Sequence, residues 1–247
     1  MNVLVTGSNG FIGKNLMDRL TADPSIQVLT HDRSNSKYDL QKNLDQSDTV
    51  FHLAGVNRSN SDLDFENVNV GLTRLIVEHL GRSKHLIPIV FTSSTQVGNN
   101  TIYGTTKSAA ERLLIDYVTE CEGKSRIYRL PNVFGKWSRP DYNSVVATFC
   151  FRVARDLIVH MPNPASQLRL ICVTDVIEKL LQELKFDSSS QLFGEVKPVF
   201  ETTVGEVYSI IKDFRYQNSG LEFRKEISQL VEDLKATYSF FSEQVEN

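Results

Sequence analysis

The sequence contains few cysteines and lacks the long apolar runs of membrane proteins. Only 3 of its 247 residues are cysteine, at positions 121, 150 and 172. This odd number, without metal-ligand spacing, argues against a disulfide scaffold or a zinc module and predicts core cysteines in a reducing compartment. No apolar run reaches the length of a membrane span, and the N-terminus reads as a strand rather than a signal peptide. We therefore expect a cytoplasmic protein with no membrane partner.

A basic character is also missing, as are internal repeats and low-complexity tracts. The formal net charge is −3, which provides no positive patch of the kind that attracts nucleic acids. Hydrophobic residues make up 40% and charged residues 23% of the chain, which is ordinary for a globular protein with a sizeable core. The composition favours a large α/β domain, alone or with a small appendage, over a nucleic-acid-binding protein.

What is present begins with three glycines between the first predicted strand and the first predicted helix. Residues 2–6 have the pattern of a buried strand with three apolar residues at its centre, and from Phe11 the apolar residues recur at helical spacing. Gly7 permits a tight turn, Gly10 lets the backbone approach a pyrophosphate, and Gly13 lets the helix pack against the strand. The N–H groups at the helix start then face the phosphates. This junction predicts a dinucleotide-binding turn.

The second predicted strand, at 26–30, leads into Asp32 and Arg33. An acidic residue about 25 positions past the first glycine is where a dinucleotide fold meets the adenosine ribose. Asp32 would accept a hydrogen bond from a 2′-hydroxyl and so favours NAD. Arg33 would pair with a 2′-phosphate and so favours NADP. The two residues leave both cofactors open.

Strand patterns alternate with helix patterns through the first 130 residues. Strands are expected at 2–6, 26–30, 48–54, 86–92 and 125–130, and helices from residue 11 and at 64–80 and 106–117. This alternation predicts a Rossmann-type, doubly wound α/β fold with a mostly parallel sheet and helices on both faces. In such sheets ligands bind beyond the carboxyl ends of the strands, where four candidates fall: Gly7, Gly55, Ser94 and Asn132. His52, inside the third strand, is predicted to be a core histidine.

After Gly135 the regular alternation of strand and helix patterns gives way to a polar and aromatic segment and less regular elements. We predict a dinucleotide-binding domain at 1–135 and a smaller substrate-binding lobe at 136–247, with additions that fold back on the first domain. Helices are expected in the lobe at 145–157, 175–184 and 204–214, and strands at 169–173 and around 199. Thr174 is expected to cap the helix that starts at 175, and the serines at 188–190 to form a soft linker.

A phenol and an ammonium group lie four residues apart in Tyr103 and Lys107. At the start of a helix this spacing places both on one side, one turn apart. A phenol with its ordinary pKa near ~10 is a poor base, and a cation one turn away favours the phenolate. Ser94, at the end of the preceding strand, can donate a hydrogen bond to the same substrate oxygen. Together the three side chains would polarise a carbonyl for hydride delivery.

These motifs together resemble the extended short-chain dehydrogenase/reductase family. The resemblance rests on GxxGxxG at 7–13, HLAG at 52–55, Ser94, the YxxxK pair and RLPNVFG at 129–135. It implies that Ser94 donates to the carbonyl, Tyr103 is the general acid/base, and Lys107 binds the ribose and activates Tyr103. Asn69 matches the family's helix asparagine, which supports the lysine through a water. The interval between Ser94 and Tyr103 is short for the family, so a tight loop is expected.

The candidate cofactor-binding set follows from this resemblance and from the strand ends. It comprises Gly7, Asn9, Gly10, Phe11, Ile12, Gly13, Asp32, Arg33, Leu53, Ala54, Gly55, Lys107 and Leu130.

Longer segments at 52–58, 128–137 and 140–155 resemble the reductase half of CapF-type capsular polysaccharide synthesis enzymes. That resemblance, which runs to about residue 238, implies NADPH-dependent reduction of the 4-keto group of a UDP-2-acetamido-2,6-dideoxy-hexulose to UDP-N-acetyl-L-pneumosamine. In that family a metal-binding cupin domain follows, whereas this sequence has no cupin and no predicted metal site. The resemblance to these reductases makes NADP(H) the favoured cofactor and NAD(H) the alternative. A homodimer and a separate cupin-type epimerase are the expected partners.

The lobe carries polar residues suited to a sugar nucleotide. Arginines can pair with a diphosphate, and asparagines can bind sugar hydroxyls or uracil. The candidate substrate-binding residues are Asn132, Lys136, Trp137, Arg139, Asn143 and Arg169, with Arg152 and Arg155 as further cations.

Three functions remain open from the sequence. The leading hypothesis is a ketoreductase for a UDP-4-keto-6-deoxy-amino sugar. The second is a sugar-nucleotide epimerase or dehydratase, although Thr95 and Gln96 follow Ser94 where a dehydratase has an Asp-Glu pair. The third is an NADP-sensing module without turnover.

Overall fold

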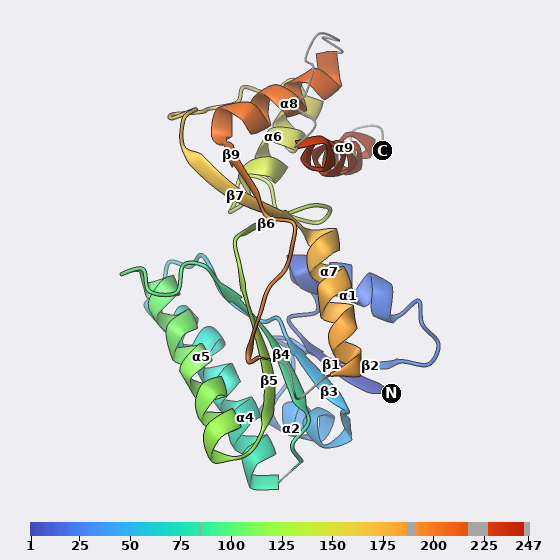
Figure 1. The fold of residues 1–247 in the computed structure, drawn as a ribbon, viewed down its shortest axis with the longest axis vertical. Helices are drawn as coiled ribbons and strands as arrows, with labels where there is room; N and C mark the ends of the chain where they lie inside the picture. Colours follow the sequence, from blue (N-terminus) through green and yellow to red (C-terminus); the bar gives the residue numbers. More distant parts are fainter. Residues whose placement is uncertain (84, 187–190, 217–226, 245–247) are drawn as a thin grey trace. The chain divides into compact units, whose positions relative to one another are not determined.

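The computed structural model describes residues 1–83, 85–186, 191–216 and 227–244, which fall into two compact units (Figure 1). The first unit comprises Met1–Leu130 and Ile177–Val196, and the second comprises Pro131–Val176 and Lys197–Asn247. The structure defines each unit by itself. The boundary predicted after residue 135 lies just beyond the first change of unit, and residues 177–196 return to the first unit.

The first unit is built on a six-stranded sheet with the order β2-β1-β3-β4-β5-β8, in which every neighbouring pair is parallel. Its strands are β1 (Asn2–Thr6), β2 (Gln27–His31), β3 (Thr49–His52), β4 (Pro88–Ser94), β5 (Lys124–Leu130) and β8 (Phe193–Gly194). The chain passes from β1 to β2 on one side and then to β3 on the other side of β1. This reversal creates the switch point at which such sheets bind ligands. The predicted Rossmann-type fold is confirmed.

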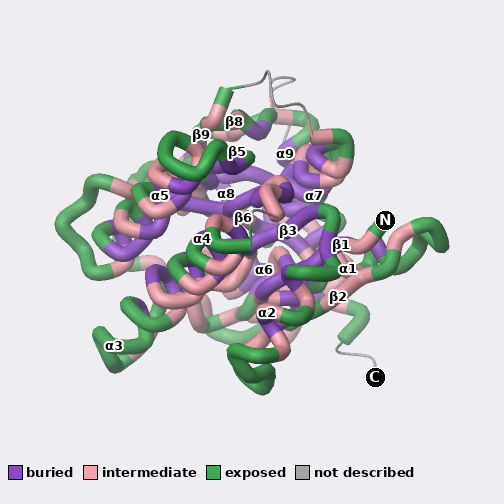
Figure 2. Tube along the Cα trace, turned by 90° about the horizontal axis from the view of Figure 1, so that it is seen from below, coloured by how far each residue is buried: buried purple, intermediate pink, exposed green. Residues whose placement is uncertain are grey.

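Helices cover both faces of this sheet. They are α1 (Phe11–Leu20), α2 (Lys37–Gln46), α3 (Asp62–Phe65), the π-helical turn η1 (Glu66–Gly71), α4 (Leu72–Ser83), α5 (Ile102–Glu120), the end of α7 (Val173–Gln182) and the short η2 (Glu183–Lys185). Apolar residues of α2, α4 and α5 form one core with the sheet. On the other face α1 is tied to α7 by an ion pair between Arg19 and Glu178 (Figure 1). β3 is buried along its whole length (Figure 2).

The second unit has its own sheet and its own core. β6 (Asn132–Phe134) is parallel to β7 (Gln167–Cys172), and β9 (Phe200–Thr203) is antiparallel to β7. The helices α6 (Val145–Ala154), α8 (Val204–Tyr216) and α9 (Ser228–Glu243) pack together around buried apolar side chains such as Phe149, Ile211 and Leu234 (Figure 1). None of the helices in the described ranges has the length and apolar character that a membrane span requires.

Several predicted elements differ from the structure. Thr174 was expected as an N-cap, and this is wrong because β7 runs directly into α7, which begins at Val173 and places Thr174 inside the helix. The single helix predicted at 64–80 is instead α3, η1 and α4 in succession. Residues 33–47, left without a predicted element, contain α2. The linker predicted at 188–190 lies outside the described residues.

Candidate active site

The glycine turn brings the end of β1 against the end of β3. Gly7 has φ +70°, and a Cβ on it would lie 2.7 Å from the Cα and backbone N of Ala54. A Cβ on Gly13 would lie 2.1 Å from the carbonyl oxygen of Gly7. Any side chain at these two positions would therefore push apart the strand, the turn and the start of α1.

The start of α1 is open to an anion. Gly10 is the N-cap residue, no side chain caps the helix, and its first turn holds no acidic residue. A Cβ on Gly10 would meet only the Gly7 carbonyl oxygen, at 3.1 Å. The first N–H groups of a helix lack partners within the helix and suit a phosphate. Asn9 is exposed beside this turn, and Phe11 and Ile12 are half-buried at the helix start.

Asp32 and Arg33 follow β2 next to the glycine turn. The Asp32 carboxylate accepts hydrogen bonds from Asn9 Nδ2 at 2.5 Å and from the Ser34 hydroxyl at 2.8 Å. Hydrogen bonds from the backbone N–H and hydroxyl of Ser34 lower the pKa of this exposed carboxyl group, so it is ionised at neutral pH. Arg33 is exposed. The structure thus presents an ionised carboxylate and a neighbouring guanidinium at the carboxyl end of β2.

The residues after β3 lie at the same edge of the sheet. The backbone N–H of Leu53 donates to the carbonyl oxygen of Thr6 at 3.2 Å, and that of Ala54 to the Thr6 hydroxyl at 3.3 Å. Leu53 and Ala54 are half-buried and Gly55 is exposed, so their backbone can be reached by a ligand. Leu130, at the end of β5, is buried.

Asn69 lies in the π-helical turn η1 and is almost fully buried. Its Oδ1 accepts from the Val56 backbone N–H at 2.8 Å, and its Nδ2 donates to the Val56 carbonyl oxygen and to Thr106 Oγ1, both at 3.0 Å. The amide therefore ties the segment after β3 to the helix α5.

Ser94 and Tyr103 meet where β4 ends and α5 begins. Ser94 is buried, and its hydroxyl donates a hydrogen bond to the phenol oxygen of Tyr103. Burial raises the pKa of Tyr103, and the hydrogen bond from Ser94 opposes that rise. Thr101 caps α5 by accepting from the Gly104 N–H at 3.0 Å. The phenol is therefore kept in its protonated form beside Ser94.

Lys107 is buried one turn after Tyr103 in α5. Its Nζ donates to the carbonyl oxygen of Thr92 at 2.7 Å and lies 4.2 Å from the centre of the Phe91 ring. Burial lowers the pKa of Lys107 to about 7, and the charge of Glu111 opposes this fall. The sequence predicts that Lys107 lowers the pKa of Tyr103, whereas burial raises that pKa and Ser94 is the group that opposes it.

Sequence reasoning missed an ion pair behind these residues, between the buried Glu111 and the exposed Arg129. Glu111 accepts from the Ser93 hydroxyl at 2.5 Å and from Arg129 Nη2 at 2.6 Å. It thereby links α5 to β4 and to β5, whose Ser93 and Arg129 are paired in register. The i+4 spacing from Lys107 places Glu111 on the same helix face as the lysine, but it does not identify Arg129 as the partner.

The six predicted substrate-binding residues all lie in the second unit. Asn132 begins β6 and donates from Nδ2 to the carbonyl oxygen of Arg169 on β7 at 3.3 Å, so these two are brought together. Arg169 forms an exposed ion pair with Glu201 at 3.6 Å.

The other four residues follow β6 in the loop before α6. The Lys136 ammonium lies 4.2 Å from the Trp137 ring centre, and the Arg139 guanidinium lies 4.6 Å from that of Tyr142. Asn143 is exposed. Cation–π contacts of this kind leave the charged groups at the surface, where they can still pair with an anion.

The two further arginines of the lobe are used within the unit. Arg152 donates to Asp141 Oδ1 at 2.9 Å and to the Ile158 carbonyl oxygen at 2.8 Å. Arg155 donates to carbonyl oxygens near the end of α9. Both hold loop and helix ends together.

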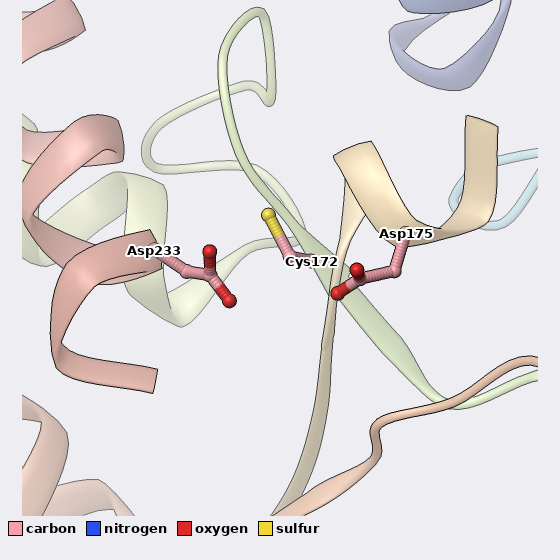
Figure 3. Close-up of side chains that lie close together, drawn as sticks. All are labelled: Cys172, Asp175 and Asp233. Carbon is pink, nitrogen blue, oxygen red and sulfur yellow. The ribbon is translucent and has the colours of Figure 1, made fainter. Parts of the chain in front are cut away.

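A separate cluster in the second unit contains Cys172, Asp175 and Asp233, whose side chains point toward one another (Figure 3). One ligand atom from each lies within 4.8 Å of the others. A thiolate and two carboxylates can bind a divalent cation. However, burial raises the pKa of Asp233 and raises that of Cys172 to about 11, so both groups favour their protonated forms. That the chain needs no metal stays a prediction.

Comparison with known proteins gives matches along most of the chain. Residues 3–193 match the family model described as the NAD dependent epimerase/dehydratase family. The chain is 36% identical over 241 residues to a UDP-2-acetamido-2,6-beta-L-arabino-hexul-4-ose reductase of Pseudomonas aeruginosa, which covers 98% of this chain and 65% of that protein. The chain thus spans about two thirds of that relative's length.

Two solved structures share the fold. The capsular polysaccharide assembling protein CapF from Staphylococcus aureus matches with a TM-score of 0.85 at 29% identity, over 100% of this chain and 66% of CapF. A UDP-glucose 4-epimerase from Thermotoga maritima matches with a TM-score of 0.84 at 20% identity, over 99% of this chain and 100% of that one, and shows the fold alone. Since the family model covers residues 3–193 of 247, the chain belongs to the NAD dependent epimerase/dehydratase family.

Proposed function

We propose that this chain reduces the C4 ketone of a UDP-2-acetamido-2,6-dideoxy-4-keto-hexose with NADP(H), giving a UDP-N-acetyl-L-pneumosamine-type product. The observation that carries the proposal is the hydrogen-bonded pair of Ser94 and Tyr103 at the carboxyl end of β4, one helical turn from Lys107. The 36% identity to a hexul-4-ose reductase supports the same substrate class.

The residues of the first unit fit a dinucleotide. The side-chain-free N-cap at Gly10 leaves room for a pyrophosphate, and the ionised Asp32 and neighbouring Arg33 stand at the ribose end of such a ligand. When bound, the nicotinamide supplies the hydride. We favour NADP(H) because Arg33 can pair with a 2′-phosphate, whereas the Asp32 carboxylate is the feature that favours NAD(H).

The catalytic side chains can then manage the ketone oxygen. Ser94 holds this oxygen by donating a hydrogen bond, while Tyr103, kept protonated by burial, gives its proton to the oxygen as C4 receives the hydride. The phenolate that results is stabilised by the Lys107 ammonium one turn away. Because its pKa lies above neutral pH, Tyr103 carries the proton that it donates in the direction of reduction.

The proposal includes the substrate-binding residues and the partners. Asn132 and Arg169, which contact each other across β6 and β7, are proposed to bind the sugar nucleotide, together with Lys136, Trp137, Arg139 and Asn143. A homodimer, a cupin-type epimerase that acts separately, and a cytoplasmic location complete the proposal.

Replacement of Tyr103 by Phe tests the chemistry. The Tyr103→Phe variant loses only the hydroxyl, so it should fold and bind NADPH like the parent, while reduction of a UDP-4-keto-sugar falls by about two to four orders of magnitude. NADPH and NADH oxidation would be followed by absorbance and the product identified by NMR. Tyr38→Phe, which removes a hydroxyl from an exposed position on α2, is the matched control. Full activity in Tyr103→Phe would refute the proposal.

The same assay separates the alternatives. An epimerase regenerates its cofactor in each cycle, so product would form without stoichiometric NADPH oxidation. A sensing module would bind NADPH and oxidise none of it with any keto-sugar nucleotide. Ser94 and Tyr103 in direct contact weigh against the sensing module.

A further inference from the structure

A continuous chain of hydrogen bonds crosses the core of the first unit from the end of β3 to the turn η1. The Ala54 N–H donates to Thr6 Oγ1 at 3.3 Å, and Thr6 Oγ1 lies 2.7 Å from His52 Nδ1. On the other side of the ring, His52 Nε2 lies 2.8 Å from Thr73 Oγ1, which lies 2.9 Å from the carbonyl oxygen of Asn69. His52 is the buried centre of this chain, so it is the core histidine expected from the sequence, but with both ring nitrogens engaged.

The direction of each hydrogen bond in the chain is fixed by its ends. Because the Thr73 hydroxyl proton is used on the Asn69 carbonyl, Thr73 can only accept from His52, whose Nε2 must therefore carry a proton. If the imidazole is neutral, Nδ1 is an acceptor, and the Thr6 hydroxyl donates to it while accepting from the Ala54 N–H. Every donor and acceptor is then satisfied by one tautomer.

Both ends of the chain lead to the candidate active site. Ala54 and Gly55 are the accessible backbone at the carboxyl end of β3, next to the glycine turn. Asn69, at the other end, binds both backbone groups of Val56 and the hydroxyl of Thr106, which precedes Lys107 in α5. Hydrogen bonds thus connect the His52 imidazole to the segment that would face a dinucleotide. Through Thr73 and Asn69 they also connect it to α5, the helix that carries the predicted acid Tyr103.

We propose that His52 is a positioning residue, in which the neutral imidazole protonated on Nε2 holds Ala54–Gly55 and the turn η1 in the arrangement that dinucleotide binding and α5 require. This inference rests on the proposed function only in assuming a dinucleotide at this edge of the sheet. It needs no particular sugar substrate, and His52 takes no part in proton transfer.

The surroundings of His52 keep the ring neutral. The residue is fully enclosed, its ring is stacked at a tilt 5.2 Å from that of Phe91, and burial is the largest cause that lowers its pKa to about 3. The charges of Lys107 and, more weakly, His31 act in the same direction. A second proton on the ring would also turn the Thr6 hydroxyl away and break the chain.

Three threonine variants test the role without touching the site itself. Thr73→Val removes the acceptor for Nε2–H while keeping the side-chain shape, and should weaken NADPH binding on the order of fivefold. Thr73→Ser retains the hydroxyl and should restore affinity. Thr49→Val is the matched control. Thr49 is buried on β3, the strand that carries His52, but its hydroxyl makes only a 3.5 Å contact to the Pro88 carbonyl oxygen. NADPH dissociation constants would be measured by fluorescence, with circular dichroism as the check of folding.

The imidazole itself gives a second, independent measurement. Nitrogen-15 NMR of the histidine rings should show His52, identified by the loss of its signals in His52→Gln or by their shift in Thr73→Val, as the Nε2–H tautomer with no titration between pH 5 and 8. An Nδ1–H tautomer, or a titration in that interval, would overturn the proposal. So would an NADPH affinity of Thr73→Val equal to that of Thr49→Val. Because both readouts need no substrate, they stand even if the proposed reductase activity fails.

Discussion

Lys107 and His52 are the two residues that combine a site position with a strongly perturbed charge. Burial lowers the pKa of Lys107 to about 7 and that of His52 to about 3, both far below the ordinary values of these groups. In both cases the folded state disfavours the proton that the unfolded chain binds, so stability rises with pH between the folded and unfolded pKa values. For Lys107 that interval runs from about 7 to the ordinary lysine value near ~10.4.

The lowered pKa of Lys107 should make the free energy of unfolding depend on pH. Lys107→Met keeps the length of the side chain and removes the charge. From pH 7 to pH 10 the free energy of unfolding of the parent should therefore rise relative to that of the variant, by about 1 kcal/mol per pH unit. The variant should be inactive at every pH. Urea unfolding at both pH values measures the difference, and Lys42→Met, at an exposed position on α2, is the control. A difference that does not change with pH would show that the folded chain does not depress the pKa of Lys107.

The sequence predicts which side chains could act on a substrate more readily than it predicts their charged partners. The pairing of Ser94 with Tyr103 follows from a strand end and a helix start in sequence order. The ion pair of Glu111 and Arg129 joins positions 18 apart on α5 and β5, and the orientation of Lys107 toward Thr92 depends on packing. Neither can be obtained from sequence spacing, because both depend on how the helix lies on the sheet.

At the scale of elements, strands and helices with a strong apolar pattern were predicted well. β1, β4, β5 and α6 lie close to their expected ranges because their apolar residues are contiguous or recur at the helical period. α2 escaped notice because only Leu40 and Leu44 are buried in it, and its start depends on the capping box of Ser36 and Asp39. The π turn at 66–71 has no sequence period of its own, and its role becomes visible only through the bonds of Asn69.

The loop between β4 and α5 sets the positions of Ser94 and Tyr103. A Cβ on Gly104 would lie 2.5 Å from the carbonyl oxygen of Gln96 and 2.8 Å from that of Asn99. These backbone atoms belong to the short loop between Ser94 and Tyr103, and they cannot move away without displacing one of these two residues. The tight loop therefore sets the spacing of the two side chains that we propose to be catalytic.

Gly104→Ala should consequently lower kcat more than it affects cofactor binding. The overpacked Cβ should cost about 1–3 kcal/mol of stability and reduce turnover at least tenfold through misalignment of Ser94 and Tyr103. Gly81→Ala in α4 is the control, because its Cβ would meet only the Cys121 side chain, at 3.2 Å. Steady-state kinetics and the dissociation constant of NADPH would be compared. Loss of NADPH binding with unchanged kcat in Gly104→Ala would contradict this expectation.

At the scale of the whole molecule, the sequence predicted two parts but placed their division more simply than the structure does. A single boundary after residue 135 could be inferred from the change in texture. The return of Ile177–Val196 to the first unit could not, because β8 has two residues and depends on pairing with β5 rather than on its own sequence. Tyr128 and Arg126 both contact Glu183, which anchors this returning segment to β5.

Each unit has a separate apolar core, and this should make their unfolding separable. The chain contains one tryptophan, Trp137, which lies in the second unit against the edge of Phe240. Its fluorescence therefore reports on the second core, whereas far-ultraviolet circular dichroism reports on helices of both. The NADPH that we propose to bind the first unit should stabilise that unit by about 2.7 kcal/mol at a concentration of 100 times Kd, because it would bind only the folded form. In urea we expect NADPH to move the circular-dichroism transition to a higher midpoint and to leave the tryptophan midpoint unchanged. An equal shift of both signals would show instead that the two cores unfold as one cooperative unit.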